Sequence, residues 1–281
     1  MDRMPTMDRK NSKILFLDLD DTLLNHNKEI TEGNRTAIQE AVKAGHRIVL
    51  ASGRPLLAVL PIAAELKLQG EGTYVLAYNG AEIYDCFRKK VLYRNPVTTA
   101  TAAELFQEAH RYGIHVQTYN HDDIFLAETE DEATLYYAKR IRIPYQIVED
   151  LEHHLPENPV KVLLIDLHDH EKLEQFRLDH QESLASRCSM FYSNPMFLEC
   201  VAPDCSKGAA IHQVAELFDL PMENTIAAGD SENDLSMIRE AGIGCAMANG
   251  TKTCKEAADY VTKADCDHDG IAEIIHKFLL N

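Results

Sequence analysis

The sequence predicts an α/β protein, a doubly wound parallel sheet interrupted by an inserted α+β domain. Short apolar runs alternate with helical patterns at both ends of the chain, which is typical of parallel strands covered by helices on both faces. Between about residues 85 and 195 the pattern changes, and strand-like segments stand close together with helices set between them. Polar clusters follow several of the apolar runs, and open α/β sheets bind ligands beyond the carboxyl ends of their strands.

The first part of the core, residues 13–84, contains three predicted strands. They are KILFLDLD, RIVLASG at 47–53 and YVLAYNGA at 74–81. We expect a helix from about Thr31 that stops at Gly45, since glycine is favoured just after a helix end. Pro55 suits the first turn of the next helix, LLAVLPIAAEL.

The second part of the core, residues 196–281, continues the alternation. Its predicted elements are the helix SKGAAIHQVAELF, the strand TIAAGD at 225–230, the helix NDLSMIREAG, the strand GCAMAN and a closing helix around IAEIIHKFLL. The insertion lies between the two parts, with boundaries near 84 and 196. Its predicted segments include the helix AAELFQEAHRYG, the strand-like runs HVQTYN, IFLAE and KVLLIDL, the helix HEKLEQFRLDHQESL and the strand MFYSN.

Composition and charge are those of a globular chain long enough for two domains, with 281 residues, 45% hydrophobic and 26% charged. The net charge of −17 argues against a nucleic-acid or anionic-membrane partner, although a cation and a local lysine can reverse the field inside a pocket. Seven cysteines without a CxxC pair read as reduced thiols and predict a cytoplasmic location. Residues 1–12 lack the apolar core of a signal peptide, and we expect them to be a disordered lead-in.

Three carboxylates are crowded into the stretch FLDLDDTLL, directly behind a run that reads as a buried strand. Strand alternation would place Asp18 and Asp20 on one side and Leu19 and Asp21 on the other. Two carboxylates this close are costly to ionise together unless a cation lies between them or their pKa values split. Oxygen ligands favour a hard ion such as Mg²⁺. Asp230, at the end of TIAAGD, is the candidate third carboxylate.

These clusters closely resemble the motifs of the haloacid dehalogenase-like (HAD) phosphohydrolases. DLDDT fits the family's DxDxT, LASGR carries the second motif's serine, SKG carries the lysine of the third, and GDSENDL fits GDxxND. The insertion, with NGA before it and FLEC and SKG after it, is similar to the type IIB cap of the Cof-type subfamily. The resemblance covers nearly the whole chain beyond residue 12. One departure is Asp21, where the subfamily usually has glycine; aspartate is tolerated at a turn.

The resemblance implies a catalytic role for each of the first two aspartates. Asp18 would attack phosphorus and form an aspartyl-phosphate, while Asp20 would protonate the leaving alcohol and then deprotonate the hydrolytic water. Mg²⁺ would be held by Asp18, the backbone carbonyl of Asp20, and Asp230.

The remaining predicted site residues bind phosphate or support the site. The phosphoryl oxygens would be held by Ser52, the backbone amides of Leu19 and Gly53, Lys207 and Asn233. Lys207 follows a predicted N-cap, Ser206, and so would sit at a helix start. Thr22 closes the first motif, and Asp234 would support the ion or orient Lys207.

For several residues the sequence leaves alternatives open. Asn233 can cap a helix as well as contact phosphate, Arg54 can form an ion pair or touch substrate, and Asn79 can form a turn or touch substrate. The HDH and DHD runs at 168–170 and 267–269 can be read as metal sites, but solvated loops are the better interpretation because nothing fixes a coordination geometry.

The predicted activity is that of a Mg²⁺-dependent phosphatase acting on a small phosphorylated metabolite, a sugar phosphate or similar. One rival is a phosphomutase of the same superfamily, and another is a non-catalytic protein that binds a phosphorylated ligand. A dehalogenase is disfavoured by Asp20, because those relatives lack the second aspartate. An intact Asp20 also favours turnover over binding alone.

Overall fold

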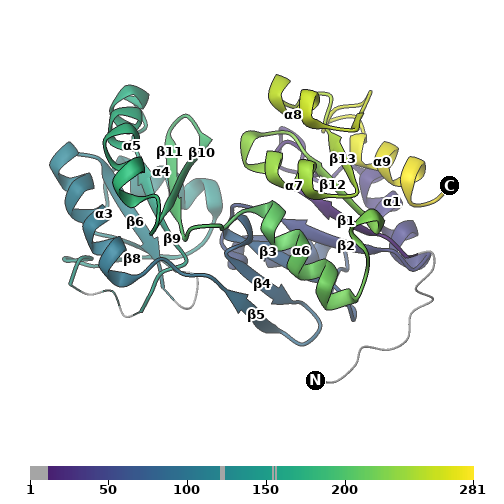
Figure 1. Ribbon diagram of the computed structural model, residues 1–281, viewed down its shortest axis with the longest axis horizontal. Coiled ribbons are helices and arrows are strands. Elements are labelled where there is room, and N and C mark those ends of the chain that lie inside the picture. Colours follow the sequence, from purple (N-terminus) through teal and green to yellow (C-terminus); the bar gives the residue numbers. More distant parts are fainter. Residues whose placement is uncertain (1–11, 121–123, 154, 156) are drawn as a thin grey trace.

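Two sheets, each with its own helices, make up the protein. The computed structural model describes residues 12–120, 124–153, 155 and 157–281. Apart from Ser12, the predicted lead-in lies outside the described residues. Figure 1 shows the two lobes side by side, with the inserted lobe on the left and the lobe that contains both ends of the described chain on the right.

The core sheet has eight strands in the order β14-β13-β12-β1-β2-β3-β4-β5. The first six run parallel, whereas β4 and β5 are added antiparallel at one edge. Their bounds are β1 Ile14–Leu17, β2 Arg47–Ala51, β3 Tyr74–Ala77, β4 Glu82–Asp85, β5 Lys90–Arg94, β12 Thr225–Gly229, β13 Ile243–Ala246 and β14 Tyr260–Val261. The core helices are α1 Glu32–Lys43, α2 Leu56–Glu65, α6 Lys207–Phe218, α7 Leu235–Glu240, α8 Lys252–Ala257 and α9 Gly270–Phe278.

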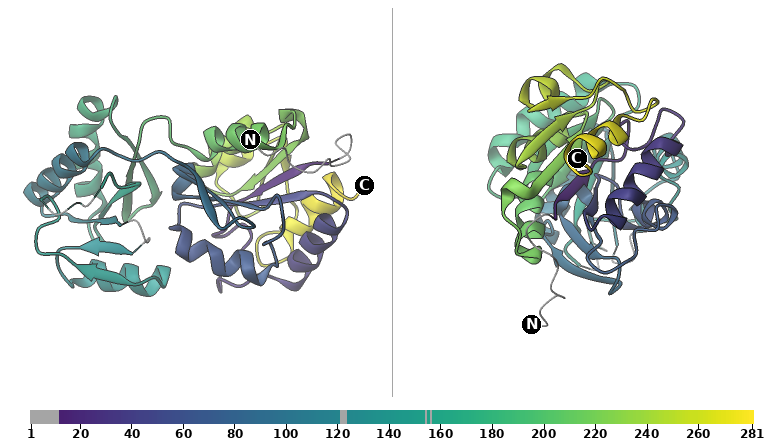
Figure 2. Two further views of the ribbon diagram at one scale, coloured as in Figure 1. Left: turned by 90° about the horizontal axis from the view of Figure 1, so that it is seen from below. Right: turned by 90° about the vertical axis from the view of Figure 1, so that its right-hand side faces the viewer.

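Helices cover both faces of the core sheet, which confirms the doubly wound architecture. Successive β1 residues face opposite sides, so Leu15 and Leu17 pack in one cluster with α1, α2 and α9. Ile14 and Phe16 pack in a different cluster with α6 and Met237 of α7. In the right-hand view of Figure 2 the purple helix α1 and the green helix α6 lie on opposite sides. All four residues of β1 are buried, which explains its continuous apolar run.

The inserted domain, hereafter the cap, is a six-stranded sheet in the order β10-β11-β9-β6-β7-β8. Its strands are β6 His115–Tyr119, β7 Phe125–Ala127, β8 Tyr145–Ile147, β9 Lys161–Ile165, β10 Ser189–Asn194 and β11 Phe197–Val201, and its helices are α3 Thr99–Tyr112, α4 Glu132–Ile141 and α5 His170–Leu184. Helices α3 and α5 pack on one face through Val162 and Leu164 of β9. Leu163 and Ile165 face the other way and share a cluster with α4 and with core residues.

The predicted boundaries of the insertion are wrong at both ends. β4 pairs antiparallel with β3, and β5 with β4, so residues 85–94 belong to the core sheet and the cap begins after Arg94. β11 pairs with β9 and β10, so the cap extends to Val201 rather than ending at 195. Strand composition alone does not reveal which sheet a strand joins, because that depends on a partner distant in sequence.

Among the described residues, no helix combines the length and the apolar character that a membrane span requires.

Candidate active site

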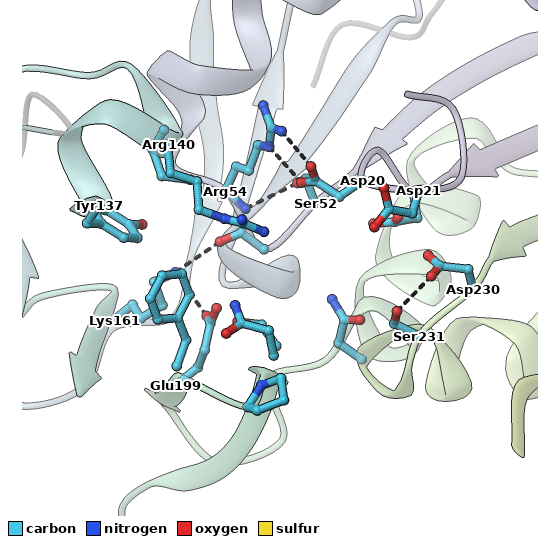
Figure 3. Close-up of a pocket in the computed structure, with 18 residues that line it drawn as sticks. Asp20, Asp21, Ser52, Arg54, Tyr137, Arg140, Lys161, Glu199, Asp230 and Ser231 are labelled. Carbon is cyan, nitrogen blue, oxygen red and sulfur yellow. Dashed lines mark hydrogen bonds and ion pairs between the residues drawn. The ribbon is translucent and has the colours of Figure 1, made fainter. Parts of the chain in front are cut away.

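A pocket of about 320 Å³ lies between the carboxyl ends of the core strands and the cap. Its core side is lined by the loops that follow β1, β2 and β12, and its cap side by α4, β9, β11 and the turn before β11. Figure 3 shows acidic side chains on the core side and Tyr137, Arg140 and Lys161 on the cap side. The position beyond the strand ends is the one predicted from the polar clusters.

Asp18 and Lys207 form the buried centre of the core side. The backbone N–H of Asp18 donates to the carbonyl of Ala228, which extends the parallel pairing of β1 with β12 by one residue. Lys207 opens α6 after Ser206, whose hydroxyl caps the helix by accepting the Ala209 N–H at 3.1 Å. Its ammonium lies 2.5 Å from Asp18 Oδ1 and 2.6 Å from Asp234 Oδ1.

Burial and the neighbouring charges set the pKa values of Asp18 and Lys207. Burial and the charge of Asp234 raise the pKa of Asp18, an effect that Lys207 opposes. Burial alone would lower the pKa of Lys207, but the charges of Asp18 and Asp234 outweigh it and raise the pKa above its usual value. The ammonium therefore stays charged, although the side chain is fully buried.

Asp230 is fixed by two hydroxyl groups. Thr22 Oγ1 donates to its Oδ1 at 3.0 Å, and Ser231 Oγ donates to its Oδ2 at 2.8 Å. Burial and the neighbouring charge of Asp234 nevertheless raise the pKa of Asp230 to about 6. The structure therefore brings Thr22 and Asp230 together, although 208 residues separate them in sequence.

Asp234 positions Lys207 and the backbone of the loop after β12. Its Oδ1 accepts from Lys207, and its Oδ2 accepts from the backbone N–H groups of Asp230 and Ser231 at 3.0 and 3.1 Å. Of the two roles predicted for it, orienting Lys207 is the one these contacts support. Together with Ser231 it forms a capping box at the helical turn Glu232–Asp234. The N-cap residues are thus Ser231 for this turn and Asp234 for α7, and not Asn233.

Asp18, Asp230 and Asp234 can hold a metal ion, because they place carboxylate oxygens within 4.8 Å of one another. Three buried carboxylates face a single ammonium in this cluster, so positive charge is in deficit. Asp18 and Asp230 line the pocket whereas Asp234 does not, so these two are the carboxylate donors that an ion in the pocket would meet. An all-oxygen donor set of this kind fits a hard divalent cation.

Asp20 is held by two cationic side chains. Arg54 donates Nε–H to its Oδ2 at 2.8 Å and an N–H of its guanidinium to Oδ1 at 2.7 Å, and Lys28 Nζ lies 3.0 Å from Oδ1. Burial opposes ionisation, but these partners prevail and lower the pKa of Asp20. Of the two possibilities left open for Arg54, an ion pair is the one observed.

Strand alternation does not orient these aspartates, contrary to the prediction, because β1 ends at Leu17 and the following residues form a turn. Asp18 and Asp20 both line the pocket, as predicted, but Asp21 lines it too instead of pointing away. Asp21 has the left-handed backbone of a turn residue, with φ of 59°. Its carbonyl accepts from Asn249 Nδ2 at 2.6 Å, a contact that connects this turn to the loop between β13 and α8.

The predicted phosphate-binding residues divide into two groups. Ser52, Gly53 and Asn233 line the pocket. Leu19 and Lys207 are fully buried and are not part of the lining, and Lys207 is connected to the pocket through its contact with Asp18. Ser52 Oγ accepts the backbone N–H of Arg54 at 3.2 Å, which orders the loop after β2.

Asn79 bridges the core and the cap. Its Oδ1 accepts from Asn233 Nδ2 at 3.1 Å, and its Nδ2 donates to Glu199 Oε2 of the cap at 3.3 Å. Its backbone is left-handed, with φ of 57°, so the turn interpretation describes its conformation. The side chain is 1% exposed, and both its polar atoms are engaged by protein.

Sequence reasoning missed the cap side of the pocket. Lys161 and Glu199 form a buried ion pair of 2.9 Å, and Lys161 Nζ also donates to the carbonyl of Gly53 at 3.0 Å. The rings of Tyr78 and Tyr119 enclose the ammonium, with centroids at 5.6 and 5.3 Å. The sequence does contain a signal for this pair. Lys161 and Glu199 each lie in an apolar run typical of a buried strand, and a buried charge requires a partner.

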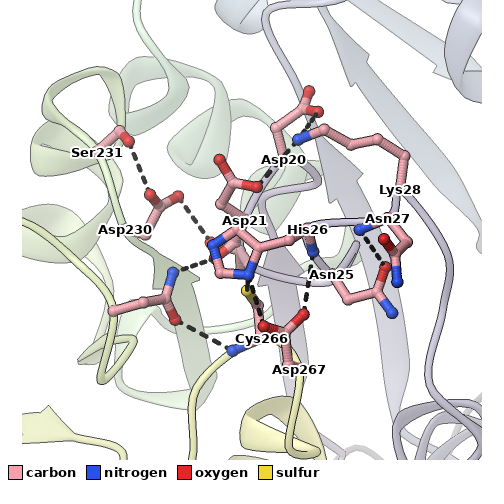
Figure 4. Close-up of polar contacts among 12 residues, drawn as sticks. Asp20, Asp21, Asn25, His26, Asn27, Lys28, Asp230, Ser231, Cys266 and Asp267 are labelled. Carbon is pink, nitrogen blue, oxygen red and sulfur yellow. Dashed lines mark hydrogen bonds and ion pairs between the residues drawn. The ribbon is translucent and has the colours of Figure 1, made fainter.

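The histidine-rich runs are largely solvated, as interpreted from the sequence. The side chains of His168 and His268 are 73% and 76% exposed, and each contacts a nearby acid. Asp267 lies near His26 and Cys266, and the ligand atoms of these three residues are close enough together to hold a metal ion (Figure 4). However, its two oxygens contact the backbone N–H and the ring Nδ1 of His26 at 3.1 and 2.5 Å.

Comparisons with known proteins agree with the fold and the motifs. A family model described as haloacid dehalogenase-like hydrolase matches residues 15–275. The crystal structure of a haloacid dehalogenase-like hydrolase from Bacteroides thetaiotaomicron has a TM-score of 0.87 and 33% sequence identity. That alignment covers 95% of this chain and 99% of the other.

Two further relatives are named as phosphatases. The 5-amino-6-(5-phospho-D-ribitylamino)uracil phosphatase YcsE of Bacillus subtilis is 29% identical over 272 residues, which is 95% of this chain and 96% of its own. The structure of the HAD subclass IIB sugar phosphatase BT4131 has a TM-score of 0.80 at 23% identity and covers 95% of this chain and 98% of its own. At this identity the second likeness shows the fold, which includes the cap.

Proposed function

The chain belongs to the haloacid dehalogenase-like hydrolases and is a phosphoric monoester hydrolase, and we propose that its activity depends on Mg²⁺. The proposed reaction is the hydrolysis of a small phosphorylated metabolite through an aspartyl-phosphate. The observation that carries the proposal is the placement of Asp18. Its carboxylate lines the pocket, lies 2.5 Å from a buried ammonium and belongs to a carboxylate group that can hold a metal.

In the first step a carboxylate oxygen of Asp18 attacks the phosphorus of the ester, and the bond from phosphorus to the leaving oxygen breaks. Asp20 donates a proton to that oxygen, so the alcohol departs neutral and an aspartyl-phosphate remains on Asp18. In the second step Asp20 takes a proton from water, whose oxygen attacks phosphorus. The bond from phosphorus to the Asp18 oxygen breaks, which releases inorganic phosphate and restores the carboxylate of Asp18. Lys207 keeps positive charge beside Asp18 throughout both steps.

Asp18, Asp230 and the backbone carbonyl of Asp20 would hold Mg²⁺. When bound, the ion neutralises charge between the carboxylates and the phosphoryl group. The hydroxyl of Ser52, the backbone amides of Leu19 and Gly53, and the side chain of Asn233 would orient the phosphoryl oxygens, which is supported by the position of Ser52, Gly53 and Asn233 along the pocket.

A small phosphorylated molecule fits the volume of the pocket, and the two named relatives act on different members of that class. We also propose a cytoplasmic location, which is supported by the seven cysteines being free and buried.

The nucleophile is tested by Asp18→Asn. This substitution should abolish Mg²⁺-dependent hydrolysis of p-nitrophenyl phosphate, because an amide cannot form the aspartyl-phosphate. Circular dichroism should show that the fold is retained. Asp204→Asn is a matched control, since it makes the same chemical change at an exposed turn position that tolerates asparagine. Substantial activity remaining in Asp18→Asn would overturn the nucleophile assignment.

A further inference from the structure

Arg140 reaches the pocket from the cap. It lies in the last turn of α4 and lines the same pocket as Asp18 and Asp20. Figure 3 shows its side chain extending from the helix into the pocket. Its guanidinium carbon lies 5.9 Å from the ring centroid of Phe197, another residue of the lining. A guanidinium placed over an aromatic face is held in place while its N–H groups stay available as donors.

Arg140 differs from the other cations of the pocket in its pairing. Three cationic side chains line the pocket, and two of them are neutralised by carboxylates: Arg54 by Asp20 at 2.7 Å and Lys161 by Glu199 at 2.9 Å. Arg140 has no carboxylate within 4.0 Å among the residues that the structure describes. It is therefore the lining cation, within that part of the chain, whose charge is left for a ligand.

The position of Arg140 in the helix does not by itself explain this arrangement. A basic residue in the last turn is favoured by the helix dipole, but the neighbouring Lys139 satisfies that preference equally well. Both side chains are exposed, but only Arg140 is part of the pocket lining.

We propose that Arg140 binds a second anionic group, a carboxylate or a phosphate, on the leaving-group part of the substrate. This inference rests on the proposed function, because the phosphoryl group that reacts must lie at Asp18 and only the leaving group then extends toward the cap. The planar donor fork of arginine matches carboxylate and phosphate oxygens, whereas neutral hydroxyl groups gain less from it. The substrate class is thus a phosphate ester that carries a second negative group.

Paired substrates and a matched variant test the inference. Glycerol 3-phosphate and 3-phosphoglycerate differ by a carboxylate, and fructose 6-phosphate and fructose 1,6-bisphosphate differ by a second phosphate. For each compound kcat/KM is measured. The constant for its inhibition of p-nitrophenyl phosphate hydrolysis is measured as well, so that compounds that bind without being hydrolysed are also compared. The variants are Arg140→Met and Lys139→Met, which remove one positive charge each from adjacent positions of α4.

We expect the unmodified enzyme to prefer the more anionic member of at least one pair. Arg140→Met should reduce that preference by about 10-fold or more, as for the loss of a charge-assisted hydrogen bond. Lys139→Met should leave it unchanged. The carboxylate and phosphate pairs distinguish the two possible anionic groups.

Three results would overturn the inference. One is the absence of any preference for anionic members in the unmodified enzyme, and another is an equal loss in Arg140→Met for both members of every pair. In either case hydrolysis of p-nitrophenyl phosphate would leave the proposed function standing. Failure of the unmodified enzyme to hydrolyse p-nitrophenyl phosphate would overturn the proposed function and this inference with it.

Discussion

Arg54 holds the proposed acid/base in its ionised form. Its two hydrogen bonds to Asp20, together with the nearby ammonium of Lys28, lower the pKa of that carboxyl below its ordinary value. A general acid must carry a proton when the leaving group departs. The ion pair therefore opposes the first half of the role proposed for Asp20, and substrate binding must loosen it.

Replacing Arg54 tests this opposition at the level of one residue. In Arg54→Met the pKa of Asp20 should rise, because the strongest partner of its charged form is gone. Activity that needs protonated Asp20 falls as the pH rises through its pKa, so the alkaline limb of kcat should move to higher pH. The measurement is the pH profile with an alkyl phosphate, whose leaving group needs a proton.

p-Nitrophenyl phosphate is the control substrate for this variant, because its leaving group departs without protonation and its alkaline limb should move much less. An alkaline limb that stays in place for both substrates would contradict the coupling between Arg54 and Asp20.

At the level of elements, β9 and β11 connect the cap to the loops that bear the site. Alternation along each strand puts Lys161 and Glu199 on the cap face that also carries Leu163 and Ile165, opposite α3 and α5. From there Lys161 reaches the carbonyl of Gly53, next to Ser52, and Glu199 reaches Asn79, which holds Asn233. Two proposed phosphate-binding residues are thus positioned by contacts with the cap.

This connection predicts a characteristic result in a double-mutant cycle. Lys161→Met should lower the free energy of unfolding by about 3–5 kcal/mol, because it leaves the carboxylate of Glu199 buried without its cation. The double variant Lys161→Met/Glu199→Gln should be less destabilised than Lys161→Met alone, since the unpaired charge is removed. Urea denaturation measures the stability, and kcat/KM on p-nitrophenyl phosphate reports on the site.

Strict additivity of the two single substitutions in that cycle would show that the pair does not act as a unit. Glu199→Gln alone serves as the reference, because glutamine retains a carbonyl oxygen that can accept from Lys161 and Asn79.

At the scale of the molecule, the sequence predicts individual strands and helices but not the pairings between segments that lie far apart in the chain. The parallel core was predictable because β1, β2, β3 and β12 are continuous apolar runs followed by polar residues. The boundary near 84 left β5 in the insertion, because no local pattern shows that residues 90–94 pair with β4 of the core sheet. The pairing of Lys161 with Glu199 joins two strands 38 residues apart, and no local spacing encodes it.

The carboxylate cluster also links the metal to the stability of the whole fold. Burial raises the pKa of Asp230 from 3.8 to about 6, so its ionised form is disfavoured in the folded protein. Without a metal, the stability contributed by this group is greatest below the unfolded value and is lost as the pH rises from about 3.8 to about 6. A divalent cation that binds only the folded state should restore stability above that range, by mass action.

Metal removal should therefore have an effect that depends on pH. We expect EDTA to abolish hydrolysis of p-nitrophenyl phosphate at pH 7.5 and Mg²⁺ to raise the thermal midpoint there. The increase should be smaller at pH 5, where protons compete for Asp230. Asp230→Asn should remove most of the increase at pH 7.5, whereas the exposed control Asp204→Asn should keep it. Differential scanning fluorimetry with and without Mg²⁺ measures the thermal midpoint of the unmodified enzyme at both pH values and of the two variants at pH 7.5.

Equal increases in Asp230→Asn and the unmodified enzyme would mean that the ion binds elsewhere. Activity that survives EDTA would contradict the metal requirement.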